Sequence, residues 1–339
     1  MIVQILDYGA VMEERRHLSD LALLTRAPAA LSVPGDVLAG AAAVGNPLNI
    51  RTFGAVGSSV CLYWAGMALN DYADATIDAV ERPERPVPSG RVPRRTALAV
   101  ASGLTAAGLG LAAVTGGRRS LLGAVPLAGL VWAYDLGLKG TRAGPAAMAA
   151  ARTLDVLTGA LATDPGQRTA SALRKGAGPA VLVGVHTYTL MVLSRHEIHG
   201  APARVPAATL AASTATAVAA VAPAVSRAVR DTRRSAPGPT AQVAPRPATV
   251  GPAVGAARST ALVTAGAALA YLGAYGSAQL RAVRKPSGEN VRKAVGSGIL
   301  ALMPLQAALT ARAGAPVTAV VLGVGHPLAR RLARRISPT

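Results

Sequence analysis

The chain alternates between long apolar runs and short polar breaks. A helix needs about 20 mostly apolar residues to cross the hydrocarbon core of a bilayer. The runs that approach this length cover residues 28–46, 52–70, 95–116, 119–137, 145–163, 177–198, 203–225, 259–281, 293–311 and 314–329. The pattern therefore predicts an all-α fold, a polytopic membrane bundle of nine to ten transmembrane helices.

The breaks between the runs predict how the chain is organised. Residues 1–27 are expected to form a cytoplasmic N-terminal segment, and residues 28–339 the membrane domain. The stretch 226–258 is rich in Pro and Arg, which predicts a flexible loop inside that domain. The first 26 residues do not show a basic head followed by an apolar core, so we expect no cleavable signal peptide.

Composition supports a membrane protein and weakens the main soluble alternative. Apolar residues make up 51% of the 339 positions and charged residues only 15%, whereas soluble domains are about a quarter charged. The net charge of +19 is also typical of proteins that bind nucleic acid. Aromatic residues, however, make up only 3% of the chain, too few for base stacking. The basic residues instead flank apolar runs, which predicts the lipid bilayer as partner, no nucleic acid, and a multi-pass protein of the cell membrane.

Charge clusters also predict the orientation. The break after the second run carries Arg82, Arg85, Arg91, Arg94 and Arg95, and the positive-inside rule places such a loop in the cytoplasm. The Arg-rich stretch 226–258 then falls on the opposite side, as an exception that a long linker allows.

Acidic residues concentrate directly after the second run. Five of the 16 carboxylates lie within positions 71–84, and Asp71, Asp74 and Asp78 fall within about 60° of one helix face. Stacked carboxylates repel one another unless a cation lies between them, and Mg²⁺ prefers such oxygen ligands together with substrate phosphates. The alternatives are a solvated helix end, or carboxylates paired with the arginines that follow.

Those arginines supply the second half of the expected site. Arg82, Arg85 and Arg91 stand among prolines that stiffen the loop, and guanidinium groups bind phosphate oxygens through two parallel hydrogen bonds. Together, the acidic face and the basic loop predict a site for a metal ion and a diphosphate, with the acidic motif on the cytoplasmic side.

The pattern Asn70-Asp71-x-x-Asp74-x-x-x-Asp78 resembles the first motif of the UbiA superfamily of intramembrane prenyltransferases. The resemblance implies a UbiA-like helical fold around a cavity open to lipid, with Mg²⁺ and a prenyl diphosphate bound by two acidic motifs. It implies catalytic roles for Asp71, Asp74, Asp78 and Lys139, the last of which, with Tyr134, resembles a Tyr and Lys pair of the family. The implied diphosphate ligands are Asn70, Arg82, Arg85, Arg91, Lys139 and Arg142, and the implied metal ligands are Asp71, Asp74, Asp78 and Glu197.

The second motif departs from the family pattern. The stretch from His186 to Gly200 keeps only Glu197 as a carboxylate, and its Ser-Arg-His-Glu-x-His-Gly sequence resembles the EboC-like branch of the superfamily. On one continuous helix, His186 and Glu197 would share a face about 16 Å apart. His186 is also compatible with packing, Glu197 with a salt bridge, and Asp155 with a pair to Arg152 on its own helix.

Two functions remain open from the sequence. The first is transfer of a prenyl group from a prenyl diphosphate to an acceptor, for which aromatic compounds are one candidate class, with Mg²⁺ as cofactor. The alternative is a non-catalytic membrane carrier or transporter that binds a prenylated or diphosphate lipid. The catalytic hypothesis predicts that Glu197 faces Asp71 and Asp74 across a cavity.

Overall fold

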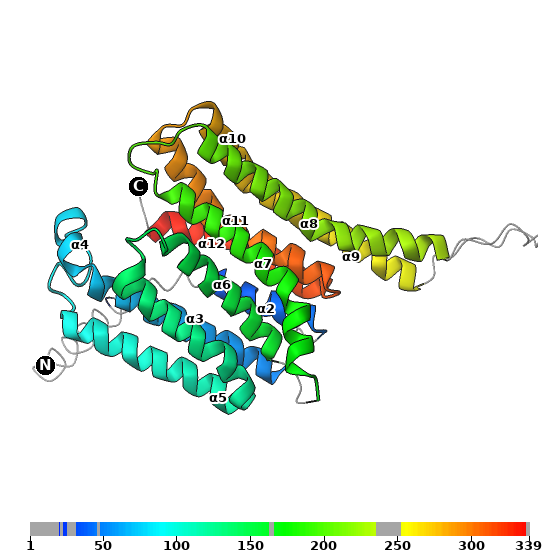
Figure 1. Cartoon of the computed structure of the whole chain (residues 1–339), viewed down its shortest axis with the longest axis horizontal. Helices are drawn as coiled ribbons and strands as arrows, with labels where there is room; N and C mark the ends of the chain where they lie inside the picture. The colour runs from blue at the N-terminus through cyan, green and yellow to red at the C-terminus, as the bar shows by residue number, and fades with distance from the viewer. Residues whose placement is uncertain are drawn as a thin grey trace, which may run out of the picture.

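The computed structural model describes residues 20, 23–25, 32–45, 48–162, 166–234 and 252–336, and these form helices without strands (Figure 1). The helices are α2 (Val33–Ala43), α3 (Ile50–Ala73), α4 (Ala75–Glu81), α5 (Arg94–Ala133), the π-helix η2 (Tyr134–Leu138), α6 (Gly144–Leu161), α7 (Thr169–Ser194), α8 (Arg204–Arg234), α9 (Pro252–Tyr271), the π-helix η3 (Leu272–Gly276), α10 (Ser277–Arg284), α11 (Gly288–Arg312) and α12 (Pro316–Ile336). The predicted all-α fold is confirmed. Most of the predicted N-terminal segment 1–27 lies outside the described residues.

Six helical segments in this part of the chain are long and apolar enough to cross a membrane. They are Ile50–Ala73, Arg94–Leu138, Thr169–Ser194, Arg204–Arg234, Gly255–Arg284 and Gly288–Arg312. Helix α2 and the segment Pro316–Pro327 are apolar but shorter. The multi-pass membrane character is confirmed, and the count of nine to ten crossings stays a prediction.

Helix α5 consists of two antiparallel halves. At Gly117 the backbone takes φ +62° and ψ −154°, a conformation that breaks the helix. The indole Nε1 of Trp132 donates a hydrogen bond of 3.0 Å to Thr105 Oγ1. In a straight helix these two residues, 27 positions apart, would be separated by about 40 Å. The predicted runs 95–116 and 119–137 thus form a hairpin within α5.

Small residues bring the helix backbones of the first half close together. A Cβ atom at Gly40 of α2 would collide with the carbonyl oxygen of Val156 on α6, and one at Gly159 of α6 would collide with that of Val37. Such close backbone approach is how helices associate in lipid, where burial of apolar surface does not drive packing. Helices α2, α3, α5 and α6 form one side of the bundle (Figure 1).

Helices α8 and α9 lie side by side and project beyond the rest of the bundle (Figure 1). Helix α8 continues to Arg234 and α9 begins at Pro252, so the stretch 226–258, predicted as a loop, is helical at both ends. Its charged residues Arg227 and Arg230 continue the turns of α8, since Arg and the Ala228 between them are good helix formers. Residues 235–251 lie outside the described residues.

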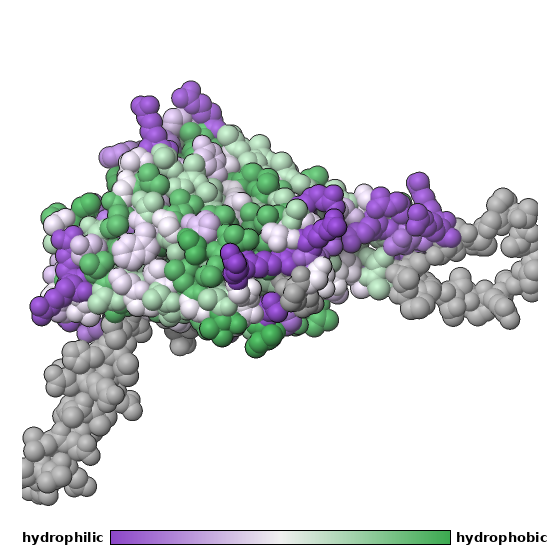
Figure 2. Space-filling model, turned by 60° about the horizontal axis from the view of Figure 1, so that its bottom comes forward, coloured by the Kyte–Doolittle hydropathy of each residue, from purple (hydrophilic) through white to green (hydrophobic). Residues whose placement is uncertain are grey.

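The surface suits a lipid environment. Apolar side chains cover much of the face in Figure 2, whereas hydrophilic residues gather at its left edge, at its top and in a row that runs from the middle to the projecting arm at the right. Large apolar side chains are exposed on the long helices, for example Val114 at 86% and Leu262 at 73%. In a soluble monomer such surface would be unusual.

Candidate functional site

The acidic motif sits where α3 passes into α4. The backbone N–H of Asp74 donates to Asn70 O, and that of Asp78 donates to Asp74 O, each at 2.8 Å. Helical hydrogen bonding therefore continues through the junction, although Asp74 itself has φ −89° and ψ 5°. The small bend at Asp74 changes the directions of the three carboxylates relative to one straight helix.

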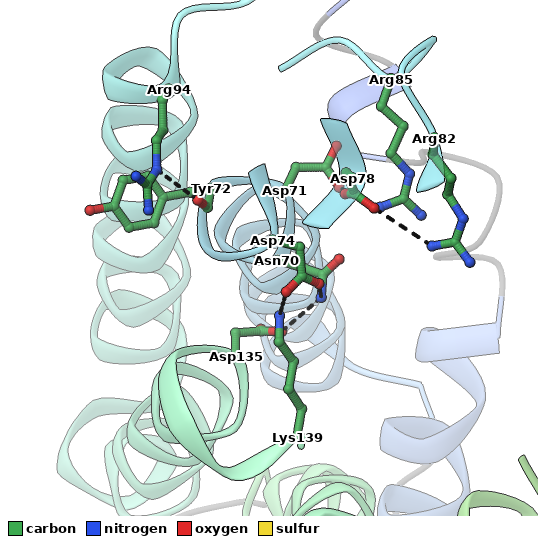
Figure 3. A network of polar contacts seen from close by, with 10 residues as sticks. All are labelled: Asn70, Asp71, Tyr72, Asp74, Asp78, Arg82, Arg85, Arg94, Asp135 and Lys139. Carbon is green, nitrogen blue, oxygen red and sulfur yellow. Dashed lines mark hydrogen bonds and ion pairs between the residues drawn. The ribbon is translucent and has the colours of Figure 1, made fainter. Parts of the chain in front are cut away.

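Asp74 belongs to a polar group at the end of the α5 hairpin (Figure 3). Lys139 Nζ lies 2.6 Å from Asp74 Oδ1. Asn70 Nδ2 donates to Asp74 Oδ2 at 3.1 Å and to Asp135 Oδ1 at 3.4 Å. The π-helix η2 carries Asp135 and ends next to Lys139, so this wider turn presents both side chains to the acidic motif.

Asp71 and Asp78 share a different cation. Arg85 Nη1 lies 3.7 Å from Asp71 Oδ1 and forms a short hydrogen bond with Asp78 Oδ2. Arg82 adds a second, longer contact to Asp78 at 3.8 Å. Asp71 and Asp78 are almost completely buried, at 1% and 2% exposure. Removing one partner of a buried ion pair is costly because it leaves the other charge unpaired, so Arg85 holds the loop onto the motif.

Two predicted diphosphate ligands are placed differently from these. The guanidinium of Arg91 donates to Glu84 O at 2.7 Å, to Ser89 Oγ at 3.0 Å and to Asp20 Oδ1 at 2.8 Å. Arg91 thus holds the loop together, and these partners among the described residues do not include the aspartates of the motif, so it is not part of their ion pairs. Arg142 is exposed and forms no ion pair with them in the described part of the chain.

The metal prediction stays a prediction. Within the described ranges, no three His, Cys, Asp or Glu side chains lie close enough to hold a metal ion together. The oxygens of Asp71, Asp74 and Asp78 are nevertheless the hard ligands that Mg²⁺ prefers. In the structure each of these carboxylates is paired with Arg82, Arg85 or Lys139, which matches the alternative of pairing with basic residues.

The role of Glu197 as a metal ligand that faces Asp71 and Asp74 across a cavity stays a prediction. Helix α7 ends at Ser194, so Glu197 lies in the following turn and not on the helix face of His186. Burial raises the pKa of the Glu197 carboxyl, and the nearby charges of Arg292 and Arg82 act in the opposite direction. Glu197 is therefore a half-buried carboxyl among arginines, away from the cavity lining.

His186 is a packing residue. Its ring is 1% exposed, with Nδ1 3.0 Å from Tyr271 Oη and Nε2 3.2 Å from Gly298 O. Tyr271 and Tyr275 meet the ring edge to face, with centroids 5.4 Å from it. Both ring nitrogens are occupied by these partners, so the ring contributes to the core of α7, α9 and α11.

A cavity of about 230 Å³ lies between α3, α5, η2 and α6. Asn70, Tyr134 and Asp135 line it beside the acidic motif. The remainder of its lining is Val33, Ser59, Leu62, Tyr63, Gly66, Met67, Leu127, Val131, Met148, Ala151, Arg152 and Asp155. The cavity therefore joins the paired carboxylates to an apolar interior.

A second ionic cluster, only partly foreseen, lies deep in the same bundle. Arg152 Nε lies 2.8 Å from Asp36 Oδ2, whereas the sequence suggested a pair with Asp155. Asp155 instead accepts a short hydrogen bond from Ser59 Oγ. Asp36 is fully buried. The sequence signal for this cluster was Asp36, a single acid within an apolar run. Ionisable groups at membrane depth are costly unless paired, so such an acid indicates a partner elsewhere in the bundle.

Comparison with known proteins places the chain in a family. Residues 32–295 match the model of the UbiA prenyltransferase family. A digeranylgeranylglyceryl phosphate synthase from Ignicoccus hospitalis is 36% identical over 156 residues, which cover 45% of this chain and 50% of that protein. One from Methanopyrus kandleri is 46% identical over 86 residues, 25% of this chain and 31% of that protein. The matches thus span half the length of these curated relatives or less.

Two solved structures share the fold. One, described as giving insights into the biosynthesis of digeranylgeranylglyceryl phosphate synthase in membranes, aligns with a TM-score of 0.55 at 13% identity over 87% of this chain and 98% of that one. A UbiA homologue from Aeropyrum pernix K1 aligns with a TM-score of 0.53 at 19% identity, over 80% of this chain and 94% of that one. The chain is a multi-pass membrane protein that belongs to the UbiA prenyltransferase family.

Proposed function

We propose that this protein transfers a prenyl group from a prenyl diphosphate to an acceptor within the membrane. The observation that carries the proposal is that a cluster of charged side chains adjoins an apolar cavity. Paired carboxylates and cations, with Asp74 and Lys139 2.6 Å apart, stand at one end of a cavity whose walls are largely apolar. A prenyl diphosphate has the same division into an anionic head and a hydrocarbon tail.

The chain's own cations are suited to bind the diphosphate. Arg85 and Lys139 lie at the motif from two different elements, the loop after α4 and the end of η2. Each can exchange its carboxylate for phosphate oxygens, which form comparably strong charge-assisted hydrogen bonds. Arg82, which is more exposed, adds charge at the rim of the site. In this proposal Arg91 stabilises the loop after α4, and the exposed Arg142 contributes only positive charge at a distance from the diphosphate.

The oxygens of Asp71, Asp74 and Asp78 would hold Mg²⁺, on which the family generally depends. Bound Mg²⁺ supplies neutralisation of the negative charge that builds up on the leaving diphosphate. Asn70 fixes the direction of the Asp74 carboxylate through its amide. Glu197, predicted as a further metal ligand, would act only through the charge of the arginines beside it.

The reaction needs no covalent intermediate with the protein. The allylic C–O bond of the donor breaks, its electron pair leaves with the diphosphate, and an acceptor atom bonds to the same carbon and loses its proton. Apolar walls formed by Leu127, Val131 and Met148 exclude water, which would otherwise capture the carbocation. The site is expected on the cytoplasmic face of the cell membrane, because of the basic loop at Arg82 to Arg95.

The test uses purified protein in lipid nanodiscs with Mg²⁺, labelled farnesyl diphosphate and a panel of lipid and aromatic acceptors. The wild type is expected to release pyrophosphate and form a prenylated product. Asp74→Asn is expected to lower the rate by about 100-fold or more, because it removes charge where it acts on the transition state. Glu289→Gln is the matched control, since Glu289 is an exposed carboxylate paired with Lys293.

A carrier that binds prenyl diphosphates without turnover is the second candidate. It is favoured by one observation, the pairing of each carboxylate in the motif with a cation of the same chain. Saturable Mg²⁺-dependent binding of farnesyl diphosphate, with no pyrophosphate released across the acceptor panel, would select the carrier.

A further inference from the structure

The cavity is elongated along α3. Its lining residues on that helix, from Ser59 through Leu62, Tyr63, Gly66 and Met67 to Asn70, recur at the spacing of one helix face. Eleven residues separate Ser59 from Asn70, so the two ends of the cavity lie about 16 Å apart along the helix. The Asn70 end adjoins the acidic motif, and the Ser59 end lies deep in the bundle.

Between these ends the walls are mostly apolar, and charge returns at the deep end. Arg152 and Asp155, one turn apart on α6, line the cavity there together with Ser59. Asp155 is 4% exposed and Ser59 2%. Charged groups at membrane depth are costly unless they are paired or used. Their position on a cavity wall is therefore a feature that helix packing alone does not require.

The deep cluster is held rigidly from behind. Asp36 on α2 binds Arg152 Nε through one carboxylate oxygen at 2.8 Å. Its other oxygen accepts a hydrogen bond of 2.7 Å from Gln306 Nε2, which also donates to Ser32 O at 2.8 Å. Arg152 Nη2 lies 3.4 Å from the same Ser32 oxygen. Three helices, α2, α6 and α11, thus fix the guanidinium at one end of the cavity.

The polar atoms of Arg152 and Asp155 that are not used within the cluster determine which ligand would bind. A guanidinium has more N–H donors than the two atoms of Arg152 that are used by Asp36 and Ser32. Ser59 donates to Asp155 Oδ1, and among the described residues Asp155 Oδ2 accepts no hydrogen bond. A donor and an acceptor therefore stand side by side on the cavity wall. A hydroxyl group, which both donates and accepts, satisfies both.

Charge and polarity exclude the other ligand classes. Two carboxylates, Asp36 and Asp155, stand around one guanidinium, so an anionic ligand would add negative charge to a cluster that already has more acid than base. A purely apolar group would occupy the end without pairing the polar atoms, which costs free energy. We propose that Ser59, Arg152 and Asp155 form a binding site for a neutral hydroxyl group of the acceptor. This inference rests on the proposed function, whose acceptor it narrows to uncharged, hydroxyl-bearing molecules.

Three probes of one shape test the site without turnover. A naphthalenediol, its dimethyl ether and the naphthalenedicarboxylate of the same substitution are titrated calorimetrically into the nanodisc-embedded protein. The wild type is expected to bind the diol about 10-fold more tightly than either analogue, the value of one good hydrogen bond. Asp155→Asn and Ser59→Ala are expected to reduce this preference to less than about 3-fold.

Thr153→Ala is the matched control, because Thr153 is also a polar residue of α6 but bonds to Ala149 O and does not line the cavity. Equal binding of the three probes to the wild type, no saturable binding of the diol, or an unchanged preference in a folded Ser59→Ala protein would overturn the proposal. Binding of farnesyl diphosphate with Mg²⁺ is measured on the same samples. If the wild type does not bind farnesyl diphosphate, the proposed function is contradicted. The preference for the diol is then still a separate result.

Discussion

The α3–α4 junction and the loop after α7 lie at the same end of the bundle (Figure 1) and differ in the number of carboxylates that they carry. The first carries Asp71, Asp74 and Asp78, which are matched by Arg82, Arg85 and Lys139. The second carries Glu197 alone, beside Arg292 and Arg82. A set of opposite charges in balance can accept a divalent cation together with an anionic diphosphate. A single carboxyl among arginines has no such capacity, and the proposed site therefore lies in the first half of the chain.

Removing the ion pairs of Arg85 is expected to have the largest effect, a loss of affinity for the diphosphate. Arg85→Gln removes the cation shared by Asp71 and Asp78. We expect the affinity for farnesyl diphosphate with Mg²⁺ to fall by about 10- to 100-fold, the value of charge-assisted hydrogen bonds. Mg²⁺ alone should bind more tightly to the variant, since two carboxylates lose their competing cation. Calorimetry measures both quantities.

The control for that change is Arg281→Gln. Arg281 is an exposed arginine of α10, so its removal lowers the net charge by the same amount without touching the motif. An equal loss of diphosphate affinity in both variants would assign the effect to overall charge and contradict the role of Arg85.

Changing Glu197, in the loop after α7, is expected to have a smaller effect on the rate of the reaction. Glu197→Gln should change the rate of pyrophosphate release by less than about 3-fold, because Glu197 neither lines the cavity nor joins the aspartates. The comparison is made at saturating farnesyl diphosphate. A loss as large as that of Asp74→Asn would show that Glu197 reaches the reacting atoms and would contradict the contrast between the α3–α4 junction and the loop after α7.

The smallest expected effect is on stability. Burial raises the pKa of Glu197 above its ordinary 4.5, so its contribution to stability is complete at low pH. That contribution is lost as the pH rises from about 4.5 through the raised value, because the folded state then loses the proton it holds more tightly. Thermal unfolding of the wild type and of Glu197→Gln over this pH range should show a steeper fall in stability in the wild type than in the variant. Identical slopes would contradict the assigned cause.

Local patterns predicted the features that depend on neighbours in sequence. The apolar runs 95–116 and 119–137 correspond to the two halves of α5, since Gly117 permits the backbone reversal between them. The spacing of Asp71, Asp74 and Asp78 correctly marked a charged motif at the end of a helix. The basic loop after it supplies Arg85, as the alternative of carboxylate–arginine pairs required.

Features that depend on distant contacts were not predictable in the same way. Arg152 has Asp155 one turn away, yet it pairs with Asp36, more than a hundred positions earlier, because α2 packs closely on α6 through Gly40 and Gly159. Glu197 was expected on the face of His186, but α7 ends before it at Ser194. Helix ends and long-range pairs depend on packing, which a single local pattern does not contain.

The most direct test of the central claim is an experimental structure with Mg²⁺ and a non-reactive farnesyl thiodiphosphate. We expect the diphosphate to lie between Lys139 and Arg85, with the metal on oxygens of Asp71, Asp74 and Asp78 and the farnesyl chain entering the cavity past Asn70. A diphosphate bound beside Glu197 and Arg292, with the first motif still paired to its own cations, would contradict this expectation.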